Sequence, residues 1–509
     1  MVAISASQPP RTRRRSRATA EGAEQVDLTD APTRGTTRRN RDESGESRRK
    51  MFSLGRALKH PLADYGFLLG ATLLLLIVGL IMVMSASTVV SFRATGSSYT
   101  LFLRQLLFAI IGLIAMVALS RMPVSFFRRM AYPAIVVSFV SLILVLVPGI
   151  GVEVNGQRNW ISLGGPFRLQ PSEFAKLALI IWAANLLARR RDRVTGWKSL
   201  MIPLAPVAGA LIFLILMEGD LGTTLVLMPM LAAMLLVAGA PMRLFGWMAG
   251  AIGALIALLS ITTPYRLQRF ATWLDPASDP SGTGWQVLHG QYALATGGWW
   301  GVGLGASREK WGFLPEAQTD FILAVIGEEV GLVGTLSVLA LFAVIALVIA
   351  QIAMRTDDEF VRLATTGVGI WIVAQALINI GAVVGALPIT GLPLPLVSYG
   401  GSSLTFTLMA VGMLLAFARA QPEARALLET RKAGRKSGGR RAQKRMARER
   451  REREAYSVTQ ASGASQAGGG DSPRSEDGRR RRATKPRRPR VSRPRRRDGR
   501  QERQTDGDR

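Results

Sequence analysis

The sequence predicts an all-α polytopic membrane protein with about ten transmembrane helices, both termini in the cytoplasm and a large extracytoplasmic loop between the seventh and eighth helices. Three observations lead to this fold class. The chain is 48% hydrophobic yet carries a formal net charge of +29, and no single globular core accommodates both properties. Apolar stretches of the ~20 residues needed to cross a bilayer recur along its middle. Lys and Arg gather in alternate connections between them, which sets the orientation.

Ten apolar stretches with short polar breaks define the expected membrane domain, residues 61–420. They are 65–86, 101–120, 131–148, 172–188, 200–217, 221–238, 243–261, 321–353, 363–386 and 402–418. The eighth is longer than one crossing requires, so we expect it either to tilt or to line a cavity with its first turns. The N-terminus carries basic residues without an early apolar run, which excludes a cleaved signal peptide.

Basic charge is concentrated in two tails. Residues 1–50 contain 12 Lys/Arg against 7 Asp/Glu, and residues 421–509 contain 29 against 12. Few aromatic or branched apolar residues accompany this charge, so we expect 1–60 and 421–509 to be disordered cytoplasmic tails. Arg-rich tails could bind nucleic acid, but beside a membrane domain they meet anionic lipid head groups first. We therefore expect membrane lipids, and not nucleic acid, as their partners.

The distribution of charge also separates the two faces of the domain. The connections assigned to the inside contain eleven Lys/Arg, whereas the short connections outside contain only Arg93, Arg158 and Arg168. The outer connections are longer and richer in glycine, and residues 262–320 form the largest of them. Loops of that length are usually functional or disordered, so we expect function at the outer face.

The residue inventory excludes several kinds of site. The chain has no cysteine and only two histidines, His60 and His289. Thiol nucleophiles, thiolate metal sites, histidine-rich metal clusters and a Ser/His/Asp triad are therefore excluded or disfavoured. No residues that would ligate a resident metal are predicted.

Acidic residues at membrane depth cost about 2.5 to 3.5 kcal/mol at a helix centre, so they are usually retained for a reason. Asp320 opens the eighth span, where it could either cap the helix or serve as a catalytic group. For Glu328 and Glu329, inside that span, pairing with Lys or Arg is expected. Because successive helical residues point about 100° apart, both should not face one partner. Asp220, at the start of the sixth span, is a weaker candidate.

Two further segments are chemically distinctive. Glu173 and Lys176, at the start of the fourth span, could form an i,i+3 ion pair. Alternatively, Lys176 could join Arg158 and Arg168 in an outer cationic cluster suited to a phosphate-bearing lipid. Residues 388–403 contain three prolines and paired glycines between the last two spans. We expect this segment to dip into the protein, because irregular backbone at membrane depth must be buried or line a cavity.

Residues 64–418 resemble the SEDS family of polytopic cell-wall proteins, and the Pro315-Glu316-Ala317 block resembles its FtsW branch most. The most specific block comprises Asn379, Gly385, Pro388, Gly391, Ser398, Tyr399, Gly400, Gly401, Ser402 and Ser403. Further blocks are Arg158 to Ile161, Gln170 to Lys176, Asp220 to Thr223 and Leu314 to Phe321. Gly219, in place of a usual proline, and Gln291-Tyr292, in place of Gln-Ser, depart from the family pattern.

The resemblance implies a peptidoglycan glycosyltransferase that polymerises lipid II in the bacterial cytoplasmic membrane during cell division, at the septum. It implies a class B penicillin-binding protein transpeptidase and other division proteins as partners, and lipid II with the growing glycan strand as substrates. Asp320 matches the family's essential aspartate and is the expected catalytic base. The expected substrate-binding residues are Arg158, Trp160, Glu173, Lys176, Asp220, Gln286, Lys310, Glu316, Ser398, Tyr399 and Ser402.

The bonds involved indicate an inverting single displacement that needs only one base, because a lipid diphosphate is already a good leaving group. Arg158, Lys176 and Lys310 are the cations expected to compensate its charge. No cofactor signature is present, although a divalent cation could share that work. A lipid II flippase and a non-catalytic division scaffold remain the alternatives; a flippase should place its essential groups near the bilayer midplane.

Overall fold

The computed structural model describes residues 62–154, 157–162, 164, 167–190, 197–262, 273–279, 284–427, 429–430, 443–444, 446–450 and 452. Most of both predicted tails therefore lies outside the described residues, and their predicted disorder stays a prediction. Within the predicted C-terminal tail, residues 422–427 are helical. The chain divides into two compact units, Met1–Arg431 and Lys432–Arg509, and the helical membrane domain belongs to the first.

Each predicted span coincides with a helix. The helices are α2 (Ala63–Thr95), α3 (Thr100–Ser120), α4 (Val124–Leu146), α5 (Pro171–Arg190), α6 (Trp197–Met217), α7 (Leu221–Val237), α8 (Met242–Thr262), α11 (Ile322–Arg355), α12 (Glu359–Val383) and α13 (Gly401–Ala420). Among the described residues, seven helices are long and apolar enough to cross a membrane, and α7 and Met201–Met217 of α6 are shorter apolar helices. The mainly helical membrane fold is confirmed, whereas the count of ten crossings stays a prediction.

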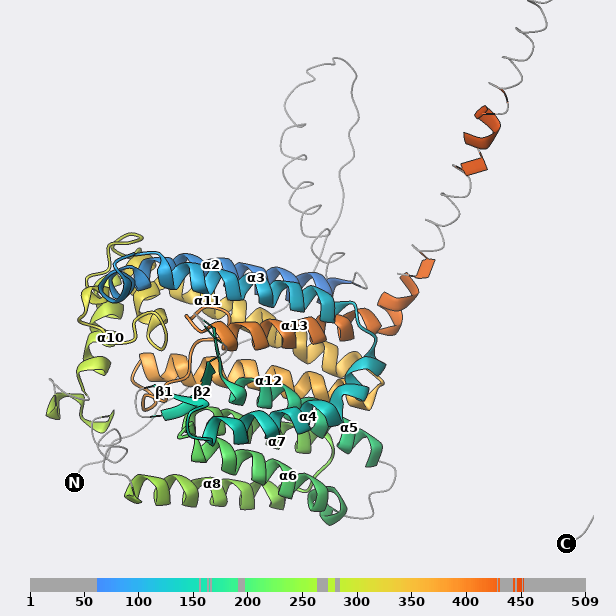
Figure 1. Cartoon of the computed structure of the whole chain (residues 1–509), viewed down its shortest axis with the longest axis horizontal. Coiled ribbons are helices and arrows are strands. Elements are labelled where there is room, and N and C mark those ends of the chain that lie inside the picture. Colours follow the sequence, from blue (N-terminus) through green and yellow to red (C-terminus); the bar gives the residue numbers. More distant parts are fainter. Residues whose placement is uncertain are drawn as a thin grey trace, which may run out of the picture. The chain divides into compact units, whose positions relative to one another are not determined.

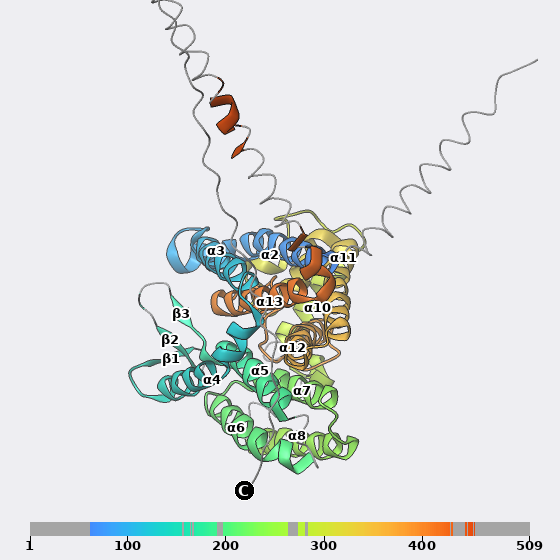
Figure 2. The same ribbon diagram turned by 90° about the vertical axis from the view of Figure 1, so that its right-hand side faces the viewer.

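The helices lie side by side in layers (Figures 1 and 2). Helices α2, α3 and α11 occupy one side, α13 and α12 the middle, α4, α5 and α7 the next layer, and α6 and α8 the opposite edge. Small residues let the backbones approach, as is usual between membrane helices. A Cβ on Gly412 of α13 would lie 2.6 Å from the carbonyl oxygen of Met116 on α3. These two helices therefore pack too closely for any side chain at Gly412.

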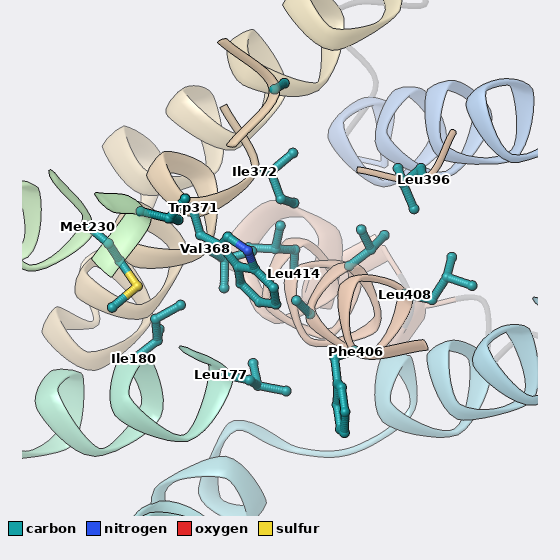
Figure 3. Packing of buried hydrophobic residues seen from close by; sticks show 14 of the residues in the cluster. Leu177, Ile180, Met230, Val368, Trp371, Ile372, Leu396, Phe406, Leu408 and Leu414 are labelled. Carbon is teal, nitrogen blue, oxygen red and sulfur yellow. The ribbon is translucent and has the colours of Figure 1, made fainter. Parts of the chain in front are cut away.

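The buried core joins α5, α7, α12 and α13. Figure 3 shows Ile180 of α5 and Met230 of α7 beside Val368 and Trp371 of α12, with Leu414 of α13 on the other side. Their side chains are at most 1% exposed. This packing fixes the relative positions of the helix ends that carry the candidate site.

Residues predicted to lie inside and outside occupy opposite ends of the bundle. Arg355, at the end of α11, pairs with Asp64 at the start of α2 (3.1 Å), and Arg128 pairs with Asp358 (2.5 Å). Asp320 precedes the other end of α11, of which the 24 residues after Gly331 alone extend about 36 Å. The candidate residues at Asp320 are therefore separated from the basic end by the whole length of a long helix.

The long eighth span resolves into two pieces. Helix α11 breaks at Gly331, whose φ of 76° and ψ of −169° are not helical. Residues 322–329 are all buried, whereas the 24 residues after the break extend about 36 Å, enough to cross a ~30 Å hydrocarbon core. The first turns thus lie inside the protein, whereas a cavity lined by them stays a prediction.

The backbone groups freed at this break bond to the outer segment. The amide N–H groups of Val302 and Gly303 donate to the carbonyl oxygens of Glu328 and Glu329 at 2.9 and 3.0 Å, and that of Leu332 donates to Gly298 at 2.9 Å. Irregular backbone at this depth is tolerated because protein groups satisfy it. The outer segment itself contains helix α10 (Trp285–Gly297) and the 3-10 turns η2 (Pro276–Ser278) and η3 (Glu309–Trp311).

One element was not expected in an all-α chain. Between α4 and α5, strands β1 (Gly151–Val154), β2 (Gln157–Ser162) and β3 (Arg168–Leu169) form an antiparallel sheet in the order β1-β2-β3. The mainly helical fold class holds, and this short sheet is a local addition that was not foreseen, because hydropathy identifies the spans and carries little information about short polar hairpins between them.

Candidate functional site

A proline-rich segment, residues 384–400 between α12 and α13, forms the centre of the candidate site; we call it the proline loop. Its residues Leu392, Leu394, Leu396 and Val397 are at most 4% exposed. The expectation that this segment dips into the protein is therefore confirmed. A Cβ on Gly79 of α2 would lie 2.7 Å from the carbonyl oxygen of Leu396, so the loop rests directly on the α2 backbone.

Three buried amide side chains satisfy the backbone of the proline loop. Gln105 of α3 donates to the carbonyl oxygen of Ser398 (3.2 Å) and accepts from the N–H of Gly400 (3.1 Å). Gln375 and Asn379 of α12 donate to the carbonyl oxygens of Pro393 (2.9 Å) and Leu392 (2.8 Å). None of the three amides is more than 2% exposed. Sequence analysis missed Gln105 and Gln375, although an amide at membrane depth is itself a signal of an internal partner.

Asp320 lies in the turn before α11, against this loop. The cap position of α11 is Phe321, one residue later. Asp320 is partly buried, and its backbone carbonyl accepts from Asn379 Nδ2 at 2.7 Å. Its Oδ2 would be 3.9 Å from a Cβ placed on Gly391 of the loop. Loop and carboxylate are therefore direct neighbours.

Backbone strain is concentrated in the same two segments. Among the described residues, Glu316 (φ 52°) and Leu396 (φ 66°) are the non-glycine residues with positive φ. Glu316 belongs to the turn that leads to Asp320, and its carboxylate accepts from Thr319 Oγ1 at 2.7 Å. Conformations of this kind cost about 1–3 kcal/mol each and tend to occur at functional sites.

Lys176 lies inside the bundle and not in a cluster at the outer surface. Its ammonium pairs with Glu173 at 2.9 Å, donates to Gln375 Oε1 at 3.0 Å and stands 4.8 Å from the centre of the Trp371 ring. The i,i+3 ion pair expected from the sequence is confirmed. The alternative placement beside Arg158 was wrong, because Lys176 is fully buried and its donors point to α12.

Lys310 is likewise saturated by protein groups. Its ammonium donates to Ser85 Oγ (3.0 Å), the carbonyl oxygen of Gly305 (2.7 Å) and Glu329 Oε1 (2.9 Å), which uses all three of its donors. Glu329, its ionic partner, lies seven residues after Ile322 at the start of α11, or about 10 Å along the helix axis. Because protein groups already use the donors of Lys310, its expected role beside the diphosphate stays a prediction that these contacts do not support.

The two glutamates of α11 do not face one cation, as expected from the helix geometry. Both contact Ser307, which donates from Oγ to Glu328 Oε2 (2.5 Å) and from its backbone N–H to Glu329 Oε1 (3.4 Å). Glu328 also accepts from the backbone N–H of Arg308 at 2.8 Å. Pairing of Glu329 with a lysine is confirmed.

Asp220 is a structural centre at the start of α7. Its carboxylate accepts from Thr223 N (2.8 Å), Thr223 Oγ1 (2.7 Å), Ser172 Oγ (2.9 Å) and Gln170 Nε2 (3.1 Å). It therefore joins the start of α7 to the start of α5. Ser402 Oγ accepts from the N–H of Gln170 at 3.3 Å, which connects the same point to α13.

Glu218, in the turn before Asp220, was not singled out by sequence analysis. Its side chain is 2% exposed, and neither carboxyl oxygen has a hydrogen-bond partner in the described part of the chain. Burial, and then the negative charge of Asp220, raise the pKa of Glu218 to about 9. The group is therefore neutral at physiological pH.

Two cations, Arg104 and Arg168, act on Tyr399 of the proline loop. Tyr399 donates its backbone N–H to the carbonyl oxygen of Gln318 (2.8 Å), two residues before Asp320. Burial raises the pKa of the Tyr399 phenol, whereas Arg104, which bonds to it, and Arg168 lower it. Sequence analysis missed Arg104 because this residue lies within an apolar span.

The remaining predicted residues lie on supporting elements. Arg158, on β2, faces Glu153 of β1 at 3.9 Å, and Trp160 is paired with Val152 in the same hairpin. Gln286 of α10 donates to the carbonyl oxygen of Pro315 at 3.1 Å. Substrate contact by each of these residues stays a prediction.

Chemically, the site places the partly buried carboxylate of Asp320 beside the proline loop, and Arg104 and Arg168 act on Tyr399 of that loop. Ser398 and Tyr399 belong to the same loop, and Ser402 follows it at the start of α13. Lys310 instead bonds to protein groups away from this loop. Among the described residues, no group of three or more His, Asp or Glu side chains is arranged to hold a metal ion. A carboxylate beside a loop on which two guanidinium groups act suits acid–base chemistry on an anionic ligand.

Comparison with known proteins identifies the family. Residues 67–423 match a family model described as FtsW/RodA/SpoVE cell cycle protein. The chain is 42% identical over 382 residues to a probable peptidoglycan glycosyltransferase FtsW of Mycobacterium tuberculosis, covering 75% of this chain and 73% of that protein. It is 41% identical over 350 residues to the stage V sporulation protein E of Bacillus subtilis, covering 68% and 95%.

Solved structures agree with the sequence relatives. The rod shape determining protein RodA of Thermus thermophilus is similar with a TM-score of 0.53 at 27% identity, covering 70% of this chain and 96% of that one. A chain from a peptidoglycan synthase complex that coordinates polymerization and crosslinking gives a TM-score of 0.54 at 31% identity, covering 68% and 98%. The match spans the whole helical region, and the chain therefore belongs to the FtsW/RodA/SpoVE family of cell cycle proteins.

Proposed function

We propose that this chain is a peptidoglycan glycosyltransferase that polymerises lipid II, with Asp320 as the catalytic base. The observation that supports the proposal most directly is the position of Asp320, partly buried and directly beside the strained proline loop. The relatives named as probable peptidoglycan glycosyltransferases supply the reaction class. A positioned base typically contributes about 10² to 10⁴ in rate.

The proposed reaction is a single displacement. The 4-hydroxyl oxygen of the GlcNAc of lipid II attacks the anomeric carbon of the growing strand, and Asp320 accepts the hydroxyl proton. The bond from that carbon to the diphosphate oxygen breaks, so undecaprenyl diphosphate leaves with the bonding electrons. The new linkage has inverted configuration. Negative charge that moves to the diphosphate requires fixed cations.

We assign that compensating role to Arg104 and Arg168, which act on Tyr399 beside the Asp320 turn. Arginine suits a diphosphate because its planar guanidinium can donate two parallel hydrogen bonds to phosphate oxygens. This assignment replaces Lys176 and Lys310, whose donors are already used within the protein. Arg158 remains a candidate at the neighbouring sheet.

The cellular setting is also part of the proposal. A class B penicillin-binding protein would crosslink the strands that this chain makes, in the cytoplasmic membrane at the division septum. The similarity to a chain of a peptidoglycan synthase complex supports such a partnership, and the greater number of FtsW relatives supports a role in division.

The test is polymerisation of labelled lipid II by purified full-length protein with its transpeptidase partner. We expect glycan strands from the wild type and from a variant lacking residues 432–509, and none from Asp320→Asn. Strands made at the wild-type rate by folded Asp320→Asn would overturn the proposal. Movement of lipid II across vesicles without polymer would instead establish the flippase alternative.

A further inference from the structure

The side chain of Asn379 connects two segments that are far apart in the sequence. Its Nδ2 donates to the backbone carbonyl oxygen of Asp320 at 2.7 Å and to that of Leu392 in the proline loop at 2.8 Å. Both amide hydrogens are therefore used, one on each segment. A single side chain on α12 thus joins the turn that carries the carboxylate to the loop beside it.

The orientation of this amide is fixed by its partners. Backbone carbonyl oxygens can only accept, so the nitrogen, and not the oxygen, must face Asp320 and Leu392. Asn379 is 2% exposed, and its Oδ1 is buried without a hydrogen-bond partner in the described part of the chain. A buried polar atom left without a partner costs free energy, and an apolar residue at this position would avoid that cost. We therefore expect the two hydrogen bonds donated by Asn379 to be the reason for an amide here.

The turn that Asn379 holds also has connections of its own: Gln286 donates to the carbonyl oxygen of Pro315, and the N–H of Phe321 donates to that of Glu316. The cap residue of α11, Phe321, offers no side-chain hydrogen bond, and Glu316 adopts a positive φ in the same turn. Tyr399 N–H, which donates to Gln318, is the second connection from the proline loop. Asn379 bonds to the backbone of Asp320 itself and to the proline loop, and so contributes directly to the position of the Asp320 carboxylate relative to the loop.

We infer that Asn379 is a positioning residue that sets the place of the Asp320 carboxylate for the chemical step. The inference rests on the proposed function. A displacement of about 1 Å at a reacting group costs about 10²-fold in rate. Loss of the Asn379 amide should therefore lower kcat by about that factor, while KM for lipid II changes little because Asn379 itself is buried.

Gln105 supplies a matched control. It is equally buried, at 2% exposure, and makes two hydrogen bonds to the same proline loop at Ser398 and Gly400. No hydrogen bond connects it to the Asp320 turn among the contacts described above. If Asn379 served only to hold the loop, Gln105→Ala and Asn379→Ala should have the same consequences.

The experiment measures kcat, KM and thermal unfolding for Asn379→Ala, Asn379→Asp and Gln105→Ala in the full chain with its partner. All three should unfold at lower temperature than the wild type. In both Asn379 variants, kcat should fall about 10²-fold while KM stays nearly unchanged. The loss of kcat in Asn379→Asp should be at least as large as in Asn379→Ala, because a carboxylate oxygen would face two carbonyl oxygens. Gln105→Ala should keep kcat within a few-fold.

Two results would overturn the inference. One is a folded Asn379→Ala protein whose kcat stays within a few-fold of the wild type, and the other is an equal loss of kcat in Asn379→Ala and Gln105→Ala. Asp320→Asn, measured in parallel, separates the two levels. If Asp320→Asn keeps full activity, the proposed function fails; if it is inactive while Asn379→Ala is normal, only the positioning role fails.

Discussion

Replacing Glu218 by glutamine should make the protein more stable, and more so at higher pH. The Glu218 carboxyl is 2% exposed, and neither of its oxygens has a hydrogen-bond partner within the described residues. Burial and the charge of Asp220 raise its pKa from 4.5 to about 9. The folded protein therefore keeps this group protonated at pH 7, whereas the unfolded chain ionises it.

The sign and the size of this stability change follow from proton binding by the Glu218 carboxyl in the folded and unfolded states. Between pH 4.5 and 9 the folded state binds one proton more than the unfolded state at this position, so stability falls as pH rises through this window. Each pH unit above the ordinary pKa of 4.5 lowers the free energy of unfolding by about 1.36 kcal/mol. At pH 7, about 2.5 units above that pKa, the protein has lost about 3 kcal/mol of stability at this position. Glutamine has nearly the same shape and no ionisable proton, so Glu218→Gln should recover about this amount.

Thermal unfolding of purified protein at pH 5, 7 and 8.5 measures the effect. The gain for Glu218→Gln over the wild type should be small at pH 5 and largest at pH 8.5. Asp220→Asn is the informative comparison, because it removes the neighbouring charge but also weakens four hydrogen bonds at the start of α7, and should be destabilising. A Glu218→Gln protein that is no more stable than the wild type at pH 8.5 would refute the reasoning.

Three further outcomes follow from the contacts. Lys310→Met should destabilise the fold by about 3–5 kcal/mol, because it leaves Glu329 buried without its cation. In thermal unfolding, the double variant Lys310→Met/Glu329→Gln should recover most of that loss, and equal stability of the single and double variants would contradict this. Gly331→Ala should prevent correct folding, because φ at Gly331 is 76° and the new Cβ would lie 2.4 Å from the backbone nitrogen of Gly301. The effect would be seen as loss of monodisperse protein, and a well-folded Gly331→Ala protein would show that the α11 break is not required. Arg104→Gln should raise KM for lipid II about tenfold, as expected for one lost charge-assisted contact of ~1.4 kcal/mol, and an unchanged KM would remove Arg104 from the diphosphate site.

The fold was largely predictable from the sequence because membrane crossing imposes a coarse requirement. Every apolar stretch of suitable length coincides with a helix, and the charged ends pair as the orientation required, as between Arg355 and Asp64. The break at Gly331 was not predictable, since apolar residues continue across it and hydropathy does not report backbone dihedral angles. The β1-β2-β3 sheet was missed for a similar reason: its residues neither cross the membrane nor alternate clearly.

The backbone course of the site could be predicted from the sequence, whereas the partners of its charged side chains could not. The pattern of prolines and glycines correctly identified a loop that enters the protein, and Asp320 lies beside that loop. The partners of two of the three expected cations could not be predicted, because sequence position does not show where a flexible side chain ends. Lys176 points inward to Gln375 and Lys310 to Glu329. Arg104 was not singled out because it lies within an apolar span.

Buried amides explain how a membrane protein can hold an irregular segment in one conformation. In water, the carbonyl oxygens of the proline loop could be solvated in many arrangements. Inside the bundle, the amides of Gln105, Gln375 and Asn379 each donate to one of them. Each amide has fixed donor and acceptor atoms, so the loop must adopt a register that matches all three. The strained φ of Leu396 is then a cost of that register. Because Asn379 also bonds to Asp320, the same constraint that shapes the loop helps to place the carboxylate, as a single-base mechanism requires.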